Sequence, residues 1–491
     1  MLKRNLIANY LGQGWVALMG LVFIPLYIKF LGIEAFGLIG LFAVLVTWLT
    51  LLDMGLTPAL GREMARFMAG SHSAESIRDL LRSIEFIAIG MALMIVVLAA
   101  SSANWLAGSW LQAEALSVSV VSQAFAIMGL VTALRLVESV YRSSIIGLQR
   151  QVLFNMINSV MATIRGAGAV AVLVWVSPTI QAFFLWQGLV SVVTLIALAI
   201  ATYSTLPKPN RAGRFSLAAV RAVWRFAGGM MGITFLALLL TQSDKILLST
   251  LLPLSDYGYY TVAALVAGAL YMLVTPITQA WYPRLCELQA RNDQQGLVRA
   301  FHQGAQLVTV IAGSAAIVLI VFSETILYLW TQDRLLASRV APLLSVLALG
   351  NLLNALMWVP YQTQLAYGWT SLALRINFIA VLLIVPAILW ATPRYGAIGA
   401  AWVWSGLNAG YVLVGIHFMY RRILISEKQR WYIYDVALPL AFISLTVLGA
   451  KAILEGLLGT PQLAVLISLI LLLIVIVSSF IVHKLIYREK H

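Results

Sequence analysis

Charge is scarce in this chain of 491 residues: 10% of the residues are Asp, Glu, Lys or Arg, whereas 62% are apolar. A soluble domain has about a quarter of its residues charged, because its surface must interact with water. The mean hydropathy of +0.93 instead indicates that lipid surrounds most of the molecule. The composition therefore argues against an ordinary soluble protein.

Cysteine is almost absent as well. Cys286 is the only one, so the chain can form neither an intrachain disulfide nor a cysteine-based metal cluster. The sequence also lacks a phosphate-binding P-loop, an H-E-x-x-H motif, a nucleophile elbow and a histidine cluster. No connection between apolar windows is long enough to hold a folded domain. We therefore expect no enzyme, no catalytic residue and no metal site.

Long apolar windows are what the sequence has in abundance. Windows of about 20 residues recur fourteen times. In lipid, only helices and closed barrels satisfy every backbone polar group, and these windows are too long for barrel strands. We predict an all-α integral membrane protein with about 14 transmembrane helices, at 8–30, 36–60, 83–107, 118–146, 152–176, 180–203, 226–251, 258–281, 303–329, 340–366, 371–391, 397–420, 435–454 and 462–484.

Lys and Arg are distributed unevenly over the connections between these windows. With the N-terminus inside, 22 of the 32 fall on the cytoplasmic side and five on the outer side. Short basic loops stay on the cytoplasmic side of a membrane. The pattern predicts a multi-pass protein of a bacterial cytoplasmic (inner) membrane with both termini in the cytoplasm. It also accounts for the net charge of +14 without a nucleic-acid partner.

The basic connection YSTLPKPNRAGRFS, after the sixth window, predicts a linker between two halves. The halves are weakly alike, since FLGIEAFGLIG follows the first window and LLPLSDYGYYT the seventh. Six spans is an even number, so the two repeats would be parallel. We predict an N-terminal six-helix lobe at 1–206, a cytoplasmic linker at 207–225, and a C-terminal six-helix lobe at 226–425. Residues 426–491 would form two additional helices and a short cytoplasmic tail.

Positive charge within the windows is the feature that points to function. A charge at mid-bilayer costs roughly 2.5–3.5 kcal/mol on insertion scales, so each one suggests a role. Arg135, Glu138 and Arg142 are spaced i, i+3 and i+7 and share one helical face, where Glu138 can neutralise only one arginine. Arg165 has no acid in its own window. The alternative is that an arginine reaches the headgroups, which fits Arg142 about equally and Arg375 better.

Acidic residues in the windows are candidates for coupling or gating. Asp244 lies next to Lys245 in the seventh window, and neighbouring helical positions point about 100° apart. We therefore expect each of them to find its partner on another helix. Asp53, in the second window, would either carry a proton or fix the packing of its bundle. Asp53, Glu138 and Asp244 are the candidates, with H+ or Na+ as a possible coupling ion and no other cofactor.

The tenth window carries Asn351, Asn354 and Trp358 along one stripe. Amides bind hydroxyl groups, and a flat indole can stack on a pyranose ring, so the stripe suits a sugar-binding surface. Hydrogen bonding between helices in lipid explains the same residues equally well. Both interpretations stay open from the sequence.

A family resemblance joins these observations. The run NYLGQGWVALMGLVFIPLYIKFLGIEAFGLIGLFAVLVTWLTLLDMGLTPALGREMAR resembles the opening of bacterial polysaccharide repeat-unit (O-antigen type) flippases. These proteins belong to the multidrug/oligosaccharidyl-lipid/polysaccharide exporter superfamily. TQSDKILLSTLLPLSDYGYY is similar to their seventh span, and RYGAIGAAWVWSGLNAGY to their eleventh-to-twelfth connection.

The resemblance implies a MATE-like fold of two six-helix lobes around a central cavity and transport by alternating access. It also implies an undecaprenyl-diphosphate-linked oligosaccharide as cargo. Superfamily members that flip lipid-linked precursors have a positively charged cavity, to which Arg135, Arg165, Arg142 and Arg375 would correspond. Some lipid II flippases also have two extra C-terminal helices.

An unpaired surplus of positive charge matches a diphosphate, because guanidinium groups bind phosphate oxygens strongly. The sequence therefore predicts a flippase that moves an O-antigen or exopolysaccharide repeat unit from the inner to the outer leaflet. The expected partners are the lipid-linked glycan, membrane lipid, and polysaccharide polymerase or assembly proteins. The substrate-binding candidates are Arg135, Arg165, Arg142, Arg375, Lys245, Asn351, Asn354 and Trp358.

Two other functions fit parts of the sequence. A cation-coupled drug or metabolite antiporter of the same superfamily would use the acidic candidates. A membrane-embedded glycan polymerase or ligase would need a concave site outside the bilayer, and the outer connections are too short to build one.

Overall fold

The computed structural model of the chain describes residues 2–53, 55–68, 70–207, 211, 213–369 and 371–458. Within these residues, eleven helical stretches are long and apolar enough to cross a membrane, and Ile33–Trp48 is a shorter apolar helix. The described ranges contain no β-strand beyond one isolated bridge between Gln112 and Pro253. The chain is therefore an all-α multi-pass membrane protein, as predicted. The last predicted window, 462–484, lies outside the described residues, so the number of 14 helices stays a prediction.

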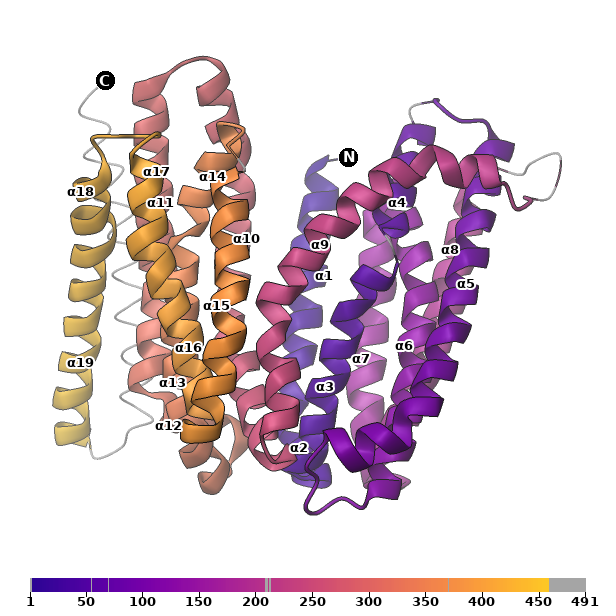
Figure 1. Cartoon of the computed structure of the whole chain (residues 1–491), viewed down its shortest axis with the longest axis horizontal. Helices are drawn as coiled ribbons and strands as arrows, with labels where there is room; N and C mark the ends of the chain where they lie inside the picture. Colours follow the sequence, from indigo (N-terminus) through magenta and orange to yellow (C-terminus); the bar gives the residue numbers. More distant parts are fainter. Residues whose placement is uncertain are drawn as a thin grey trace. The chain divides into compact units, whose positions relative to one another are not determined.

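Contacts between residues divide the chain into two compact units, Met1–Gly258 and Tyr259–His491. Each unit contains long helices that run roughly side by side (Figure 1). The helix that covers the predicted window 226–251 belongs to the first unit by its contacts. The predicted lobes 1–206 and 226–425 rest on the likeness between two halves of the sequence, and they stay a prediction.

In unit 1, α6 is the central helix and packs against α3, α4, α5 and α8. A Cβ atom added at Gly129 of α6 would lie 2.1 Å from the Cβ atom of Ala99 on α5, so only glycine permits this close approach. The elements of the unit are α1 (Leu2–Val22), α2 (Ile24–Leu31), α3 (Ile33–Leu52), α4 (Leu56–Met68), α5 (Ala74–Trp105), the π-helical η1 (Leu106–Trp110), α6 (Val118–Gly147), α7 (Gln151–Trp175), α8 (Ile180–Thr205) and α9 (Leu217–Leu251).

A buried carboxylate fixes the loop that leads into α6. Glu34, in the first turn of α3, is 7% exposed. Its oxygens accept backbone N–H bonds from Glu114 (2.7 Å), Ala115 (2.8 Å) and Leu116 (3.4 Å). The start of α6 is thereby tied to the start of α3, and these are the helices that carry Arg135 and Phe42.

The second predicted window, 36–60, is not one continuous helix. The helix α3 ends at Leu52, and α4 begins at Leu56. Gly55 has a φ of +71°, which L side chains rarely adopt, so the chain can turn there. Asp53 closes the break, since its Oδ1 accepts from the Gly55 N–H (2.7 Å) and its Oδ2 from the Thr57 hydroxyl. Hydropathy alone does not detect a break of this kind.

In unit 2, α13 is the central helix and packs against α11, α12 and α16, whereas α19 and η3 pack against α11. The helix α10 (Leu254–Ala290) spans the division between the units. The other elements are α11 (Gln294–Val321), α12 (Ser323–Thr331), α13 (Arg334–Leu356), α14 (Trp358–Ala366), α15 (Ser371–Tyr395), α16 (Ala397–Gly410), the π-helical η2 (Tyr411–Gly415), α17 (Ile416–Tyr420), α18 (Lys428–Arg430), the π-helical η3 (Trp431–Ala437) and α19 (Leu438–Leu458).

Candidate functional site

Two of the predicted arginines come together in unit 1. Arg135 on α6 and Arg165 on α7 are both half-buried near the middle of their helices. The charges of the two guanidinium groups are close enough to interact with each other and with Glu138 and Arg142. We call these four residues the arginine cluster. Its members come from the adjacent helices α6 and α7.

Glu138 and Arg142 form the one ion pair of the arginine cluster. Arg142 Nη2 lies 3.4 Å from Glu138 Oε1, one helical turn away, as the spacing predicts. The side chain of Glu138 is 5% exposed and that of Arg142 is 48% exposed. Arg142 thus holds a buried carboxylate while its own guanidinium group reaches outward.

Arg135 and Arg165 have no such partner. Across the described residues, neither guanidinium group takes part in a hydrogen bond or a salt bridge, and the Nε atom of each is buried without a hydrogen-bond acceptor. With three guanidinium groups and one carboxylate, the arginine cluster has a surplus of positive charge inside a candidate membrane span. A desolvated charge of this kind is costly, so an anionic ligand would stabilise it.

Two aromatic residues that sequence reasoning missed surround the unpaired arginines. The Cζ atom of Arg135 lies 4.8 Å from the ring centroid of Phe42 on α3, a cation–π contact. Tyr27 on α2 interacts electrostatically with Arg165, and its hydroxyl donates to the Gly166 carbonyl oxygen (3.3 Å). Both contacts join residues more than 90 positions apart, and no sequence motif signals them.

Lys245 does not fit the expectation that it needs a partner on another helix. Lys245 Nζ lies 3.5 Å from Asp244 Oδ1 and donates to the Thr241 carbonyl oxygen (3.0 Å). Lys245 departs from the expectation because a lysine chain has four methylene groups and can bend across the helix surface to its neighbour. Lys245 is therefore satisfied within α9.

Arg375 and Asp53 lie in positions that suit structural roles. Arg375 is exposed near the start of α15 and forms no ion pair with another residue of the described ranges. This placement suits a side chain that reaches the headgroup region. Asp53 is engaged by Gly55 and Thr57 at the break between α3 and α4. Its role in coupling stays a prediction.

The stripe on α13 and α14 forms a hydrogen-bonded network inside unit 2. Asn354 Nδ2 donates to Asn408 Oδ1 (2.8 Å), and Asn354 Oδ1 accepts from Trp358 Nε1 (3.2 Å). Asn351 Oδ1 accepts from the Tyr271 hydroxyl (3.1 Å) and from Trp404 Nε1 (2.9 Å). The amides bind neighbouring helices, as the second interpretation of the stripe expects. One face of the Trp358 ring is also covered, because Tyr271 stacks on it with the ring centroids 5.6 Å apart.

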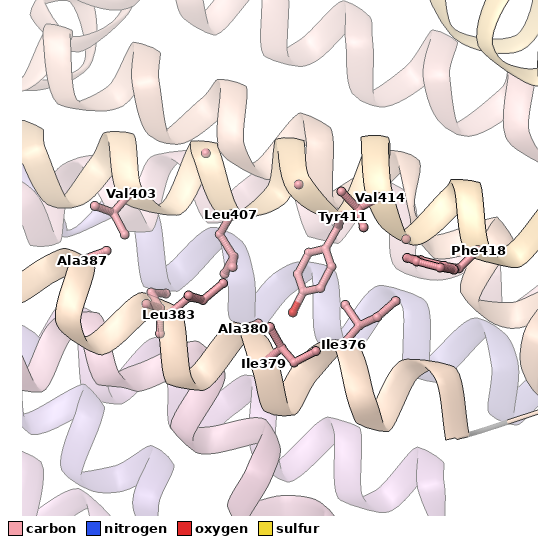
Figure 2. Close-up of a pocket in the computed structure, with 14 residues that line it drawn as sticks. Ile376, Ile379, Ala380, Leu383, Ala387, Val403, Leu407, Tyr411, Val414 and Phe418 are labelled. Carbon is pink, nitrogen blue, oxygen red and sulfur yellow. The ribbon is translucent and has the colours of Figure 1, made fainter.

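An apolar groove runs between α15 and the neighbouring α16–η2 segment of unit 2 (Figure 2). Its cavity volume is about 480 Å³. Leu383, Leu407 and Phe418 line it, and Tyr411 supplies the one polar side chain among the described residues that line it. Gly406 and Gly410 also line the groove, and a Cβ atom added at either one would meet open space. Both flanking helices are candidate membrane spans, so the groove suits a hydrocarbon chain.

Comparisons with known proteins relate these features to a family. A family model described as a polysaccharide biosynthesis protein matches residues 2–289, and the MatE model matches residues 230–390. A relative named "Putative O-antigen transporter", from Shigella flexneri, is 21% identical over 404 residues, which covers 82% of this chain and 94% of that protein.

Solved structures with similar folds are membrane transporters. The lipid II flippase MurJ in an inward closed conformation has a TM-score of 0.69 at 13% identity, covering 98% of this chain and 99% of that one. An inward-facing multidrug resistance transporter of the MATE family has a TM-score of 0.64 at 14% identity, covering 84% of this chain and 96% of that one. The similarity confirms the MATE-like fold.

Proposed function

We propose that this chain, which belongs to the polysaccharide biosynthesis protein family, is a flippase for a polyprenyl-diphosphate-linked oligosaccharide. Family membership makes it a membrane transport protein and not an enzyme. The observation that carries the proposal is the pair of unpartnered guanidinium groups, Arg135 and Arg165, inside the arginine cluster. The named O-antigen transporter and the flippase MurJ support the class of cargo.

The diphosphate is the part of the cargo that the arginine cluster would bind. Guanidinium groups donate paired N–H bonds to phosphate oxygens, and such charge-assisted bonds are about twice as strong as neutral ones. Arg135 and Arg165 have donors to spare, whereas Arg142 is engaged by Glu138. The diphosphate would therefore contact Arg135 and Arg165 first.

The polyprenyl chain of the cargo needs apolar surroundings. The groove between α15 and α16 offers an apolar lining within two candidate spans (Figure 2). We assign the polyprenyl chain to this groove. A Cβ atom at Gly406 or Gly410 would meet open space, so we expect Gly406→Leu or Gly410→Leu to narrow the groove and lower transport while the protein level holds.

The rest of the proposal follows the family resemblance. Movement would run from the inner to the outer leaflet by alternating access, in a bacterial inner membrane with both termini cytoplasmic. An H+ or Na+ gradient would drive it, and a polysaccharide polymerase or assembly protein would receive the product.

A binding experiment tests the assignment of the cargo. Purified protein would be titrated with undecaprenyl diphosphate, undecaprenyl monophosphate and undecaprenol. We expect Arg135→Ala and Arg165→Ala each to weaken diphosphate binding by roughly 10–100-fold, since a hydrogen bond to a charged group is worth about 1.5–3 kcal/mol. Undecaprenol binding should not change.

Arg394→Ala is the matched control, because Arg394 is exposed at the end of α15 and its guanidinium group rests on the Trp390 ring. In a deletion strain, the two cluster variants should abolish surface polysaccharide at normal protein level, and the control should restore it. Unchanged binding and full complementation by both cluster variants would refute the proposal.

A cation-coupled drug or metabolite antiporter is the second candidate, because the MatE model matches residues 230–390. That function would predict increased drug susceptibility in the deletion strain. It would also predict a loss of resistance in the Asp53→Asn variant, without any change in surface polysaccharide.

A further inference from the structure

A buried group of three titratable side chains lies in unit 2, apart from the arginine cluster. His302 is on α11, Asp435 is on the π-helical segment η3, and Glu427 directly precedes α18. The side chain of His302 is 2% exposed, that of Asp435 is 0% exposed and that of Glu427 is 18% exposed. The three residues join α11 to the start of the thirteenth predicted span.

Both ring nitrogens of His302 face carboxylate oxygens. Nδ1 is in hydrogen-bond contact with Asp435 Oδ2, and Nε2 lies 2.9 Å from Glu427 Oε2. Gln306, one turn along α11, donates from Nε2 to the other oxygen of Asp435 (3.0 Å). His302 is thus held between two acids, one buried and one near the surface.

This geometry fixes the number of protons in the group. A neutral imidazole has one N–H donor and one nitrogen lone pair, and an ionised carboxylate only accepts. A lone pair directed at a carboxylate oxygen at this distance would be repulsive. Both contacts are attractive only if the group holds one proton more than a neutral imidazole and two ionised carboxylates would hold together.

The charged groups around His302 are consistent with a bound proton. Arg430 Nη1 lies 3.7 Å from Glu427 Oε2, so an imidazolium and a guanidinium group together balance the two carboxylates. The hydroxyl of Tyr420, on α17, is buried without a hydrogen-bond partner in the described ranges and interacts electrostatically with Asp435 and Glu427.

The other elements that pack on α11 place their charges elsewhere. Lys451 of α19 donates to the Val321 carbonyl oxygen, at the opposite end of α11 from His302. Glu324 of α12 and Arg334 of α13 line a cavity with Lys451 at that same end. None of these three side chains forms a hydrogen bond or an ion pair with His302, Asp435 or Glu427 across the described residues.

We propose that His302, Asp435 and Glu427 form a proton-binding site, in which an imidazolium held between two carboxylates fastens η3 to α11. This proposal is independent of the cargo. Loss of the proton leaves two carboxylates against a neutral ring, with a net negative charge in a buried place, so the contact opens. Glu427 and Arg430 reach solvent, so a proton can exchange without opening the helix core. Asp435 lies on a π-helical segment, a geometry that frequently marks functional sites.

Histidine-selective 15N NMR on the purified full chain, without cargo, tests the proposal. We expect one histidine signal with both ring nitrogens protonated at neutral pH, and its loss in His302→Gln. In Asp435→Asn the same ring should become neutral at that pH. His417→Gln is the control, because it removes a histidine of α17 that contacts Lys428 and not the two acids.

Thermal unfolding provides the second measurement, and the bound proton determines the direction in which stability changes with pH. The proton stabilises the folded protein at low pH, and this contribution is lost as pH rises. The stability of the wild type relative to His302→Gln should therefore fall toward alkaline pH. If His302→Gln does not fold, Glu427→Gln serves instead, because Glu427 is the outermost of the three residues. A neutral His302 ring in the wild type at neutral pH, or parallel pH profiles, would overturn the proposal.

Discussion

The arginine cluster of unit 1 and the histidine site of unit 2 treat buried charge in opposite ways. In the histidine site, every ionised group faces a group of opposite charge once a proton is bound to the His302 ring. The only ligand that this site needs is therefore a proton. In the arginine cluster, Arg135 and Arg165 face no carboxylate of their own among the described residues. A balanced site of this kind fastens helices together, whereas an unbalanced one can bind a larger anion.

Reversing one charge in the arginine cluster should have the largest effect on transport and on diphosphate affinity. Arg165→Glu would supply an internal partner for Arg135 and convert the open cluster into a balanced one. We expect transport to be abolished and diphosphate affinity to fall by more than about 100-fold, which corresponds to roughly 3 kcal/mol. Normal folding, measured by thermal unfolding, would accompany this loss. Retention of diphosphate affinity would show that the surplus charge does not bind the cargo.

Removing one partner from the balanced site should have a different consequence. Asp435→Ala removes the carboxylate that faces His302 Nδ1 and leaves that buried ring nitrogen without its partner. The free energy of unfolding should fall by about 3–5 kcal/mol, because the partner charge remains buried. Denaturation in detergent measures the effect. Diphosphate affinity of the folded fraction should stay at the wild-type value, and a specific loss of affinity would contradict the separation of the two sites.

The amide network offers an intermediate case, since it is buried and polar but uncharged. Asn354→Ala removes the bonds to Asn408 and Trp358. Interhelical hydrogen bonds in membranes contribute about 0.6–1.7 kcal/mol, so a destabilisation of that size is expected. A strong transport defect with unchanged stability would instead favour the sugar-binding interpretation of this stripe.

Increasing the surplus positive charge of the arginine cluster should have the smallest effect on diphosphate affinity, and it should raise that affinity. Glu138→Gln removes the only carboxylate of the arginine cluster and releases Arg142 from its ion pair. We expect diphosphate to bind a few-fold more tightly, corresponding to about 0.5–1 kcal/mol. Titration with undecaprenyl diphosphate measures this change. Weaker binding would indicate that Glu138 positions Arg142 for the cargo.

Most of the fold could be predicted from the sequence, because the bilayer imposes long apolar helices on any chain of this composition. The break at Asp53–Gly55 could not, since hydropathy averages over the few residues that turn the chain. The surplus positive charge of the arginine cluster could be predicted from the sequence, because guanidinium groups rarely occur in a membrane span without a role.

The contacts that complete each site could not be predicted from one sequence. Phe42 looks like any apolar residue of a span until Arg135 is seen to lie over its ring. His302 directly precedes the predicted window 303–329, a position where a histidine usually faces the interface. Its carboxylates are 125 and 133 positions away, so only the packing of η3 on α11 brings them together.

Two residues that line the groove between α15 and α16, Gly406 and Gly410, carry no side chain, and a Cβ atom added at either one would meet open space. A flexible hydrocarbon chain could therefore slide over these two positions without any side chain there changing its rotamer. Such a surface would hold a hydrocarbon chain loosely, so the chain could move along the groove at little energetic cost.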